Sequence, residues 1–189
     1  MQIRFYDTKA RQKRPFKPIN ENEIKFYVCG PTVYDRAHIG NARPAVVFDI
    51  LFRFFRHVYG KNNVTYVRNF TDIDDKINKK SIDEGKSIKK ITDETIDWYE
   101  SDMTTLNILK PTISPRATDF IQAMINQIEV LVSKGNAYMD GGGHVLFAVN
   151  SFPDYGQLSK RRLADMEAGA RIEIADNKKN PMDFVLWKP

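Results

Sequence analysis

The sequence predicts an α/β fold that begins with a parallel β-sheet, and three neighbouring segments support this prediction. Residues 24–28 alternate in polarity and are rich in β-forming residues, which indicates a strand. A loop over residues 29–41 separates them from an apolar segment with helical periodicity, and residues 64–69 form a second strand candidate. Strand, loop, helix and strand in this order are typical of the start of a parallel α/β sheet.

The helix of this unit is predicted to begin near Pro44, because a proline in the first turn sacrifices no hydrogen bond. Gly60 is suited to its end. Ahead of the unit, residues 2–6 form a short strand candidate, and a basic linker with Pro15 and Pro18 follows. The helix is expected to bury a stripe of apolar residues at helical spacing: Val47, Ile50, Leu51, Phe54, Phe55 and Val58.

Further helices are predicted downstream. The first is capped by Asp72 and ends at Gly85, and the second begins at Ser87. The Ser-Pro pair at residues 114–115 is expected to open another, which ends at Gly135. Apolar residues at helical spacing are expected to face inward: Ile73, Ile77, Ile82, Ile88, Ile91, Trp98, Met103, Leu106, Phe120, Ile121, Met124, Ile125, Ile128, Leu131 and Val132.

A β-hairpin is predicted near the end of the sequence. Residues 137–139 and 144–149 flank the turn Asp140-Gly141-Gly142-Gly143. Residues 150–189 are expected to be rich in loops. Because the apolar run Phe184–Trp187 lies directly before a final Lys-Pro, we expect the chain to be a cut piece of a longer protein.

The composition favours a soluble cytoplasmic protein. The 189 residues are 42% hydrophobic and contain one cysteine, Cys29, which is typical of a reducing compartment and excludes an internal disulfide. The most apolar window, residues 45–55, contains Asp49 and Arg53, so we expect no membrane span. The N-terminus does not resemble a signal peptide. A net charge of +5 weakly favours polyanionic partners.

The loop and first helical turn over residues 29–44 contain side chains suited to a nucleotide. Open α/β sheets bind ligands where a strand ends and a helix begins, and free N–H groups there attract phosphate. His38 can donate to phosphate oxygens, Gly40 allows close approach to the backbone, and Asn41 offers an amide donor. Alone, this short motif is more typical of ordinary loop and helix-cap residues.

Longer strings of residues favour the nucleotide interpretation. Tyr27–Asp35, which includes Cys29, is followed by His38-Ile39-Gly40-Asn41. Other strings follow in a characteristic order: Tyr66–Ile77, Leu106–Leu109, Ala168–Arg171 and Asn180–Lys188. Together they resemble the class I aminoacyl-tRNA synthetases, and within that class they are most similar to the cysteinyl-tRNA synthetases. The resemblance covers nearly the whole chain, and several ordered matches are more specific than any one of them.

The resemblance implies a Rossmann-like nucleotide-binding catalytic domain. It also implies that ATP, with Mg²⁺, activates L-cysteine to cysteinyl-adenylate, and that cysteine is then transferred to tRNA(Cys). His38 and Asn41 match the first and last positions of the signature that stabilises the ATP phosphates, although the family usually has a histidine in place of Asn41. Gly30, Thr32 and Gly40 match positions near the adenylate.

Cys29 matches a zinc ligand of the family, in which the metal holds the thiolate of the substrate. Zinc binds thiolates far better than hydroxyl groups, which would separate cysteine from serine. Thr71 matches a position in the amino-acid pocket, and we expect Cys29 and His38 to face a common cleft. The other family ligands, a Cys, a His and a Glu, fall beyond residue 189; His57 and His144 do not match them. We therefore expect weak zinc binding or none.

The leading hypothesis is a truncated, monomeric member of this family that is inactive alone. Residues 1–110 would form the first half of the catalytic domain, and residues 111–189 the start of the connective insertion. A cysteine:amino-sugar ligase and a non-catalytic nucleotide-binding module remain alternatives, whereas the absence of Gly-x-Gly-x-x-Gly after the first strand disfavours a dehydrogenase. The acids Asp72, Asp74 and Asp75 are interpreted as a helix N-terminus rather than as a Mg²⁺ site.

Overall fold

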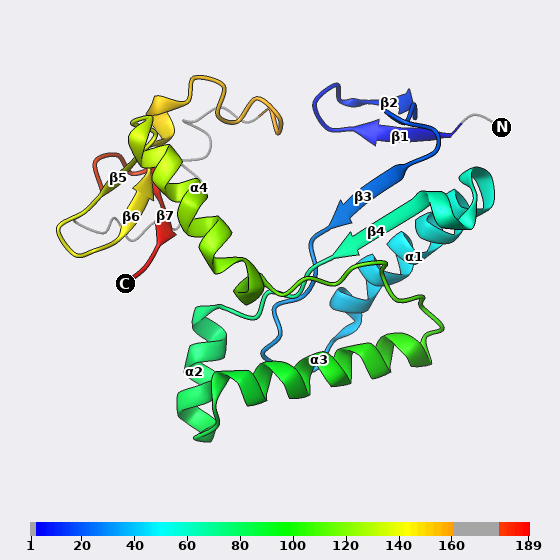
Figure 1. The fold of residues 1–189 in the computed structure, drawn as a ribbon, viewed down its shortest axis with the longest axis horizontal. Coiled ribbons are helices and arrows are strands. Elements are labelled where there is room, and N and C mark those ends of the chain that lie inside the picture. Colours follow the sequence, from blue (N-terminus) through cyan, green and yellow to red (C-terminus); the bar gives the residue numbers. More distant parts are fainter. Residues whose placement is uncertain (1–2, 161–177) are drawn as a thin grey trace. The chain divides into compact units, whose positions relative to one another are not determined.

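A computed structural model describes residues 3–160 and 178–189 of the chain. Two compact units make up the structure (Figure 1): residues 17–121 form one, and residues 1–16 together with 122–189 form the other. The string Ala168–Arg171 lies outside the described residues. All the predicted site residues belong to the unit of residues 17–121.

Two parallel strands form the centre of this unit, as predicted. β3 (Ile24–Val28) pairs with β4 (Val64–Arg68), with Ile24 opposite Val64. Figure 1 shows the two arrows side by side and pointing the same way. Every second residue of β4 is buried, and the last of these is the charged residue Arg68. The parallel pair therefore ends on an unusual buried cation.

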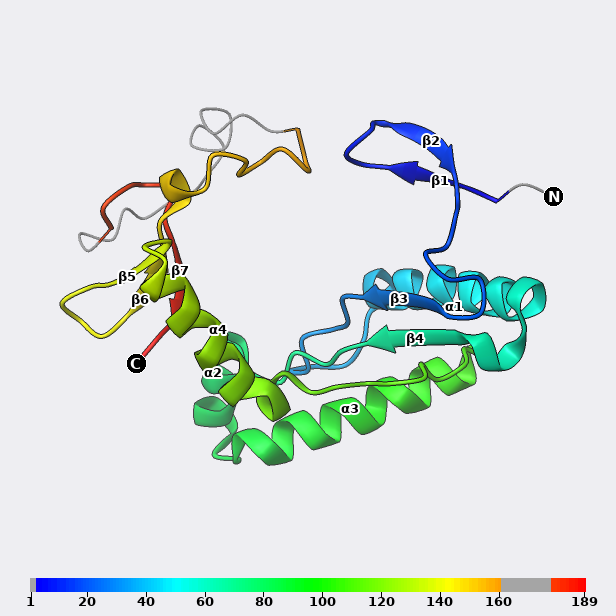
Figure 2. The same cartoon turned by 45° about the horizontal axis from the view of Figure 1, so that its top comes forward.

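α1 (Ile39–Tyr59) connects the two strands and packs against both of them (Figure 2). The prediction that this helix begins at Pro44 is wrong, because the helix begins at Ile39 and Pro44 lies inside it. A cap at His38 opens the helix earlier than the proline signal suggested. Gly60 ends it, as predicted.

The predicted buried stripe of α1 is mostly wrong. Phe55 is buried, Leu51 and Phe54 are half-buried, and three members are exposed: Val47, Ile50 and Val58. The residues that the helix buries are Ala42, Ala45, Asp49, Phe52 and Phe55. Because α1 carries apolar residues on more than one side, its periodicity did not define which side faces the sheet.

Aromatic rings fill the space between α1 and the strands. Phe26 of β3 stacks on Tyr66 of β4, with ring centroids 4.6 Å apart and planes at 10°. Phe52 and Phe55 of α1 meet Phe26 edge-on at 6.2 and 5.8 Å. Such offset and edge contacts add to the burial of apolar surface and keep α1 in one position on the sheet.

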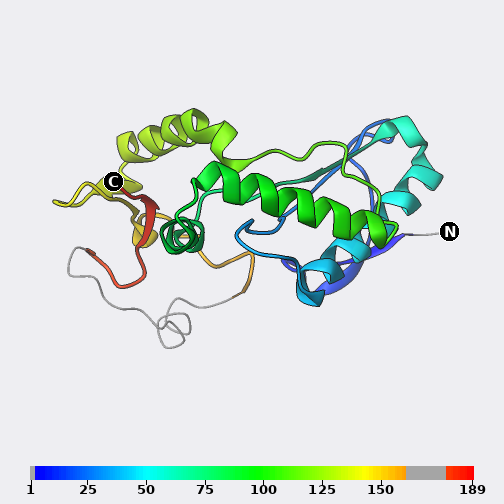
Figure 3. The ribbon, with the colours of Figure 1, turned by 90° about the horizontal axis from the view of Figure 1, so that it is seen from below.

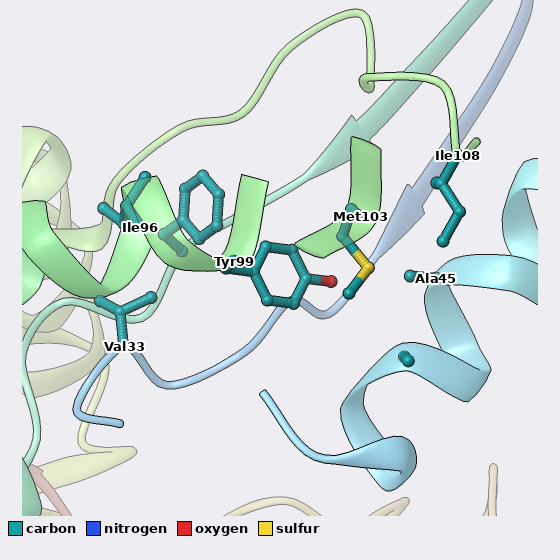
Figure 4. Packing of buried hydrophobic residues seen from close by; sticks show 8 residues of the cluster. Val33, Ala45, Ile96, Tyr99, Met103 and Ile108 are labelled. Carbon is teal, nitrogen blue, oxygen red and sulfur yellow. The ribbon is translucent and has the colours of Figure 1, made fainter. Parts of the chain in front are cut away.

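α3 (Ile88–Thr105) supplies most of the remaining core. Ser87 caps it, as predicted, by accepting a hydrogen bond from the Lys90 N–H at 3.3 Å. Of its predicted inward residues, Ile91 and Met103 are buried, Trp98 is half-buried, and Ile88 and Leu106 are exposed. The cluster that α3 forms with α1 and the neighbouring loops contains Val33, Ala42, Ala45, Phe70, Ile96, Tyr99, Met103 and Ile108. Figure 4 shows Tyr99 and Met103 pointing toward Ala45 of α1.

α2 (Asp75–Glu84) lies against α3 (Figure 3). Its N-cap is Asp74, which accepts from the Lys76 N–H at 2.9 Å, so the prediction that Asp72 caps this helix is wrong. Gly85 ends it in a left-handed conformation, with φ of 62°, as predicted. Of the predicted inward residues, Ile77 is buried, whereas Ile73 and Ile82 are exposed.

The prediction that a helix opens at residues 114–115 is wrong. This segment is extended and runs parallel to β4, with bridges from Val67 to Ile113 and from Phe70 to Arg116. The Phe70 N–H donates to the Pro115 carbonyl at 2.8 Å. α4 (Ile121–Ser133) begins only after a 3₁₀ turn, Ala117–Phe120. The segment therefore extends the parallel arrangement instead of starting a helix.

The described residues of the other unit form two antiparallel sheets. β1 (Arg4–Asp7) pairs with β2 (Gln12–Pro15), so the stretch predicted as a basic linker is partly a strand. The predicted hairpin is confirmed: β5 (Ala137–Met139) pairs with β6 (Val145–Phe147).

A strand missing from the sequence prediction completes the second of these sheets. β7 (Phe184–Trp187) pairs antiparallel with β6, so the apolar tetrad near the last residue belongs to a sheet. α4 buries no residue completely. Of the residues predicted to face inward here, Met124, Val132 and the preceding Phe120 are exposed, and the others are half-buried. None of the helices in residues 3–160 and 178–189 has the length and apolar character needed to cross a membrane.

Candidate active site

The candidate site lies where β3 ends and α1 begins. The connecting loop pairs with the segment that follows β4: the Val33 N–H donates to the Thr71 carbonyl, and the Thr71 N–H donates to the Pro31 carbonyl, both at 3.0 Å. Thr32 and Thr71 form an isolated parallel bridge. Two predicted site residues, far apart in sequence, therefore lie side by side beyond the carboxyl ends of the strands.

His38 and Asn41 form a reciprocal cap at the start of α1. The Gly40 N–H donates to Nδ1 of His38 at 3.0 Å, and the His38 N–H donates to Oδ1 of Asn41 at 3.0 Å. Because Nδ1 accepts a hydrogen bond, the neutral imidazole carries its proton on Nε2. The cap role and the phosphate role considered for His38 are thus compatible: one ring nitrogen serves the helix, and the other remains a donor.

Two glycines of the site lie where a Cβ atom would be too close to a neighbouring group. A Cβ on Gly30 would lie 1.7 Å from the Asn69 carbonyl oxygen, and the Gly30 N–H donates to Oδ1 of Asn69 at 2.7 Å. A Cβ on Gly40 would lie 2.8 Å from Cε1 of His38. Gly30 therefore lets the loop after β3 lie directly on the segment after β4, and Gly40 leaves room for the capping imidazole.

Two small adjoining cavities occupy the site. The first, which we name the cysteine cavity, has a volume of about 80 Å³ and is lined by Cys29, Gly30, Gly40, Asn41, Arg68 and Tyr99 together with their neighbours Val28, Pro31, Pro44 and Ala45. The second, the histidine cavity, has about 40 Å³ and includes Thr32 and His38. Pro31, Asn41 and Tyr99 line both. Cys29 and His38 therefore line adjoining cavities rather than the single cleft expected, and Thr71 lines neither.

Cys29 is exposed, and its Sγ–H donates a weak hydrogen bond to the Gly30 carbonyl oxygen at 3.7 Å. Zinc sites in proteins use three or four side-chain ligands. In the described residues no three His, Cys, Asp or Glu side chains come together in such a cluster. His57 lies in the last turn of α1, and His144 pairs with Asp140 at 2.9 Å. The described part of the chain thus offers one accessible thiol at the site and does not by itself fit zinc.

Arg68, which was not predicted from the sequence as a site residue, lines the cysteine cavity. Its side chain is 5% exposed, and its Nε and Nη1 have no hydrogen-bond partner. The guanidinium lies over the Tyr99 ring, 5.2 Å from its centroid. The alternation of β4 could have identified it, because residue 68 is at one of the positions that the strand buries. Isolated charges are rarely buried.

The acidic residues after β4 have structural roles. Asp72 is buried and accepts hydrogen bonds from the Thr118 N–H at 3.0 Å and the Thr118 hydroxyl at 2.5 Å. Asp74 caps α2, and Asp75 lies in its first turn. The interpretation of Asp74 and Asp75 as helix N-terminal residues is confirmed, whereas Asp72 instead links the segment after β4 to residue 118.

Comparison with known proteins identifies the family. A family model described as the catalytic domain of class I (C) tRNA synthetases matches residues 15–189. The chain belongs to this family. Its mixed α/β fold with a parallel strand pair agrees with a Rossmann-like catalytic domain. The predictions of fold and family are therefore confirmed.

Curated relatives of this class I synthetase chain are cysteine--tRNA ligases. The chain is 55% identical to that of Roseobacter denitrificans, over 100% of this chain and 41% of the relative, and 58% identical to that of Ruegeria sp. TM1040, over 99% and 41%. It is 53% identical to that of Xanthobacter autotrophicus. The chain thus spans about 41% of the length of the first two relatives.

A solved structure shares the synthetase fold. The LeuRS–tRNA–LeuAMS ternary complex of Agrobacterium radiobacter K84 matches 73% of this chain and 19% of that chain, with a TM-score of 0.53 and 20% identity. At this identity the likeness supports the fold alone.

The cap of α1 leads to a first prediction for this synthetase chain. We expect His38→Ala to lower the free energy of unfolding by about 1 kcal/mol, because the Gly40 N–H loses its acceptor. His38→Asn should cost only a few tenths of that amount, since asparagine is a preferred N-cap residue. Urea unfolding of the 189-residue chain measures both. Equal losses in the two variants would contradict the assigned cap.

Proposed function

We propose that this chain supplies the amino-acid-activating part of a cysteine--tRNA ligase. ATP, with Mg²⁺, and L-cysteine would form cysteinyl-adenylate, and cysteine would then pass to tRNA(Cys). The observation that carries the proposal is the juxtaposition of an exposed thiol, Cys29, with the capped N-terminus of α1 in adjoining cavities. The family and the names of the relatives support it.

The chemistry of the proposed step suits the residues at the α1 N-terminus. A carboxylate oxygen of cysteine attacks the α-phosphorus of ATP, the bond from that phosphorus to the oxygen bridging to the β-phosphate breaks, and pyrophosphate leaves. Negative charge builds on the phosphate oxygens during this step. The Nε2–H of His38 and the helix N-terminus are groups that stabilise such charge, and they lie at the histidine cavity.

The thiol and the two threonines are assigned to substrate binding in the same proposal. Cys29 would contribute one thiolate to a zinc ion whose other ligands lie outside this chain, and such a zinc would distinguish a thiolate from a hydroxyl group. Thr32 would lie near the adenylate and Thr71 near the amino acid. Gly30, Gly40 and Asn41 would shape the adenylate site, as their places at the cysteine cavity favour.

The domain organisation belongs to the proposal as well. Residues 1–110 would form the first half of the catalytic domain, and the connective insertion would begin in residues 111–189. We propose that the isolated chain is inactive. The cysteine cavity and the histidine cavity, of about 80 and 40 Å³, are much smaller than ordinary ligand pockets, and among the described residues Cys29 is the one side chain assigned to the metal.

A chimera tests the proposed function. Residues 1–189 would replace the aligned segment of the Roseobacter denitrificans relative, to which they are 55% identical. We expect cysteine-dependent exchange of pyrophosphate into ATP and charging of tRNA(Cys), with serine inactive. A folded chimera that lacks exchange, while the unmodified relative is active, would refute the proposal. Transfer to an amino sugar instead of tRNA would favour the paralogous ligase.

The same chimera gives a prediction for Cys29. We expect Cys29→Ser to raise the KM for cysteine by about 100-fold or more and to leave the KM for ATP nearly unchanged, because the lost thiolate serves the amino acid only. Since Cys29 is exposed, stability should change by less than about 0.5 kcal/mol. An unchanged cysteine KM would rule out a role for this thiol.

A further inference from the structure

Arg68 is a buried cation without a counter-charge in the described structure. Its side chain is 5% exposed, yet Nε and Nη1 have no hydrogen-bond partner, and no described carboxylate forms an ion pair with it. Burying an ionised group without a partner is costly, because the lost hydration is not replaced. Each unsatisfied buried group in a native structure requires an explanation, and an anion that binds there is one of them.

The aromatic neighbours of Arg68 do not neutralise it. Burial is the largest effect on Tyr66 and Tyr99 and raises the pKa of both; the Arg68 charge opposes this rise in both cases, and at Tyr66 a direct interaction with the Arg68 side chain opposes it as well. Both phenols therefore stay uncharged at neutral pH. The Tyr99 ring stabilises the guanidinium through its face, at 5.2 Å, but this contact uses none of the N–H donors.

The cysteine cavity is where an anion could reach Arg68. Its volume of about 80 Å³ is too small for a nucleotide and is suited to a group of a few atoms, such as a carboxylate. The N-terminal residues Gly40 and Asn41 of α1 line the same cavity, and the helix N-terminus adds positive potential there. Cys29 also lines it, whereas His38 does not.

We propose that Arg68 binds the α-carboxylate of the amino-acid substrate in the cysteine cavity. This inference rests on the proposed function, in which Cys29 serves the thiol end of the same molecule. The thiol and carboxylate of cysteine are separated by two carbon atoms, so both ends can occupy one small cavity. The planar guanidinium offers paired N–H donors that match a carboxylate, and holding one carboxylate oxygen would orient the other toward the α-phosphorus. Arg68 is thus a substrate-binding residue.

Nuclear magnetic resonance of the 189-residue chain tests binding at Arg68 directly. The Nε–H resonance of Arg68, assigned with Arg68→Lys, should shift when L-cysteine is added. Cysteamine, which keeps the thiol and amine but lacks the carboxylate, should leave it unmoved. AMP, which carries a phosphate and no carboxylate, tests whether Arg68 binds the phosphate of the adenylate instead. A shift with AMP but not with cysteine would overturn the carboxylate assignment, and no shift with either would overturn the site.

Kinetics of the chimera provide the second test. We expect Arg68→Gln to raise the KM for cysteine by about 10- to 100-fold, because the substrate carboxylate loses a charge-assisted hydrogen bond. The KM for ATP should not change. Arg68→Lys should recover part of the loss. Arg43→Gln, which changes an exposed arginine of α1, is the matched control and should have no effect. Equal rises in both KM values for Arg68→Gln would indicate a purely structural role. An inactive parent chimera would refute the proposed function, and the resonance test would then decide the anion site alone.

Discussion

Gly30→Ala is expected to lower the free energy of unfolding of the unit of residues 17–121 by about 3 kcal/mol or more. The added methyl group would lie 1.7 Å from the Asn69 carbonyl oxygen, which is part of the backbone and cannot rotate away. The loop after β3 would have to separate from the segment after β4. That movement would break the bond of 2.7 Å between the Gly30 N–H and Asn69 and would deform the cysteine cavity.

Urea unfolding, followed by tryptophan fluorescence and circular dichroism, measures this effect in the 189-residue chain. Gly141→Ala is the matched control, since a Cβ on Gly141 would meet no atom within 4 Å. In the chimera, Gly30→Ala should also abolish pyrophosphate exchange. A stability within about 0.5 kcal/mol of the parent chain would show that the loop does not lie against Asn69 as described.

Asp183→Ala is expected to lower the free energy of unfolding of the unit that contains β5, β6 and β7 by about 3–5 kcal/mol. Asp183 is 2% exposed and accepts three hydrogen bonds: from the Val149 N–H at 2.9 Å, the Tyr138 hydroxyl at 2.8 Å and the Asn180 N–H at 3.1 Å. Alanine would leave these donors without their acceptor. Because the Val149 N–H and the Tyr138 hydroxyl lie 34 and 45 residues away in the sequence, the sheet would lose a side chain that links the residue before β7 to β5 and to the segment after β6.

Amide hydrogen exchange tests this prediction better than urea unfolding of the whole chain does, because it measures the stability of β5, β6 and β7 separately from that of residues 17–121. Amides of β6 and β7 should lose protection in Asp183→Ala, while those of β3 and β4 keep theirs. The control is Asp154→Ala, which removes an exposed carboxylate whose partner is Gln157. Unchanged protection in β7 would contradict the anchoring role.

Several helices and strands could be predicted from local sequence signals alone. β3, β4 and the hairpin of β5 and β6 were predicted correctly because alternation and turn residues act within a few positions. The ends at Gly60 and Gly85 and the cap at Ser87 followed from local backbone and side-chain chemistry. The family assignment likewise rested on continuous strings, which need no knowledge of packing.

Other elements required the rest of the chain. Residues 114–115 contain a good helix-start signal, but hydrogen bonds from the end of β4 and from Phe70 just after it hold this segment extended. β7 is too short to be recognised alone and is a strand only because β6 offers a free edge. The buried face of α1 was misjudged because apolar residues on two sides compete, and contact with Phe26 and Tyr66 selects one of them.

In the candidate site, too, some features follow from the sequence and others depend on the tertiary structure. The sequence by itself determined that Cys29, His38 and Asn41 lie around the junction of a strand and a helix, since their spacing and order are fixed by the covalent chain. Only the tertiary structure decided that the thiol and the imidazole line separate cavities, and that Arg68 is buried beside the thiol without a partner. The physical reason is that burial and charge compensation depend on segments that fold together from distant positions, here β3, β4, α1 and α3, whereas caps and turns depend on neighbours along the chain.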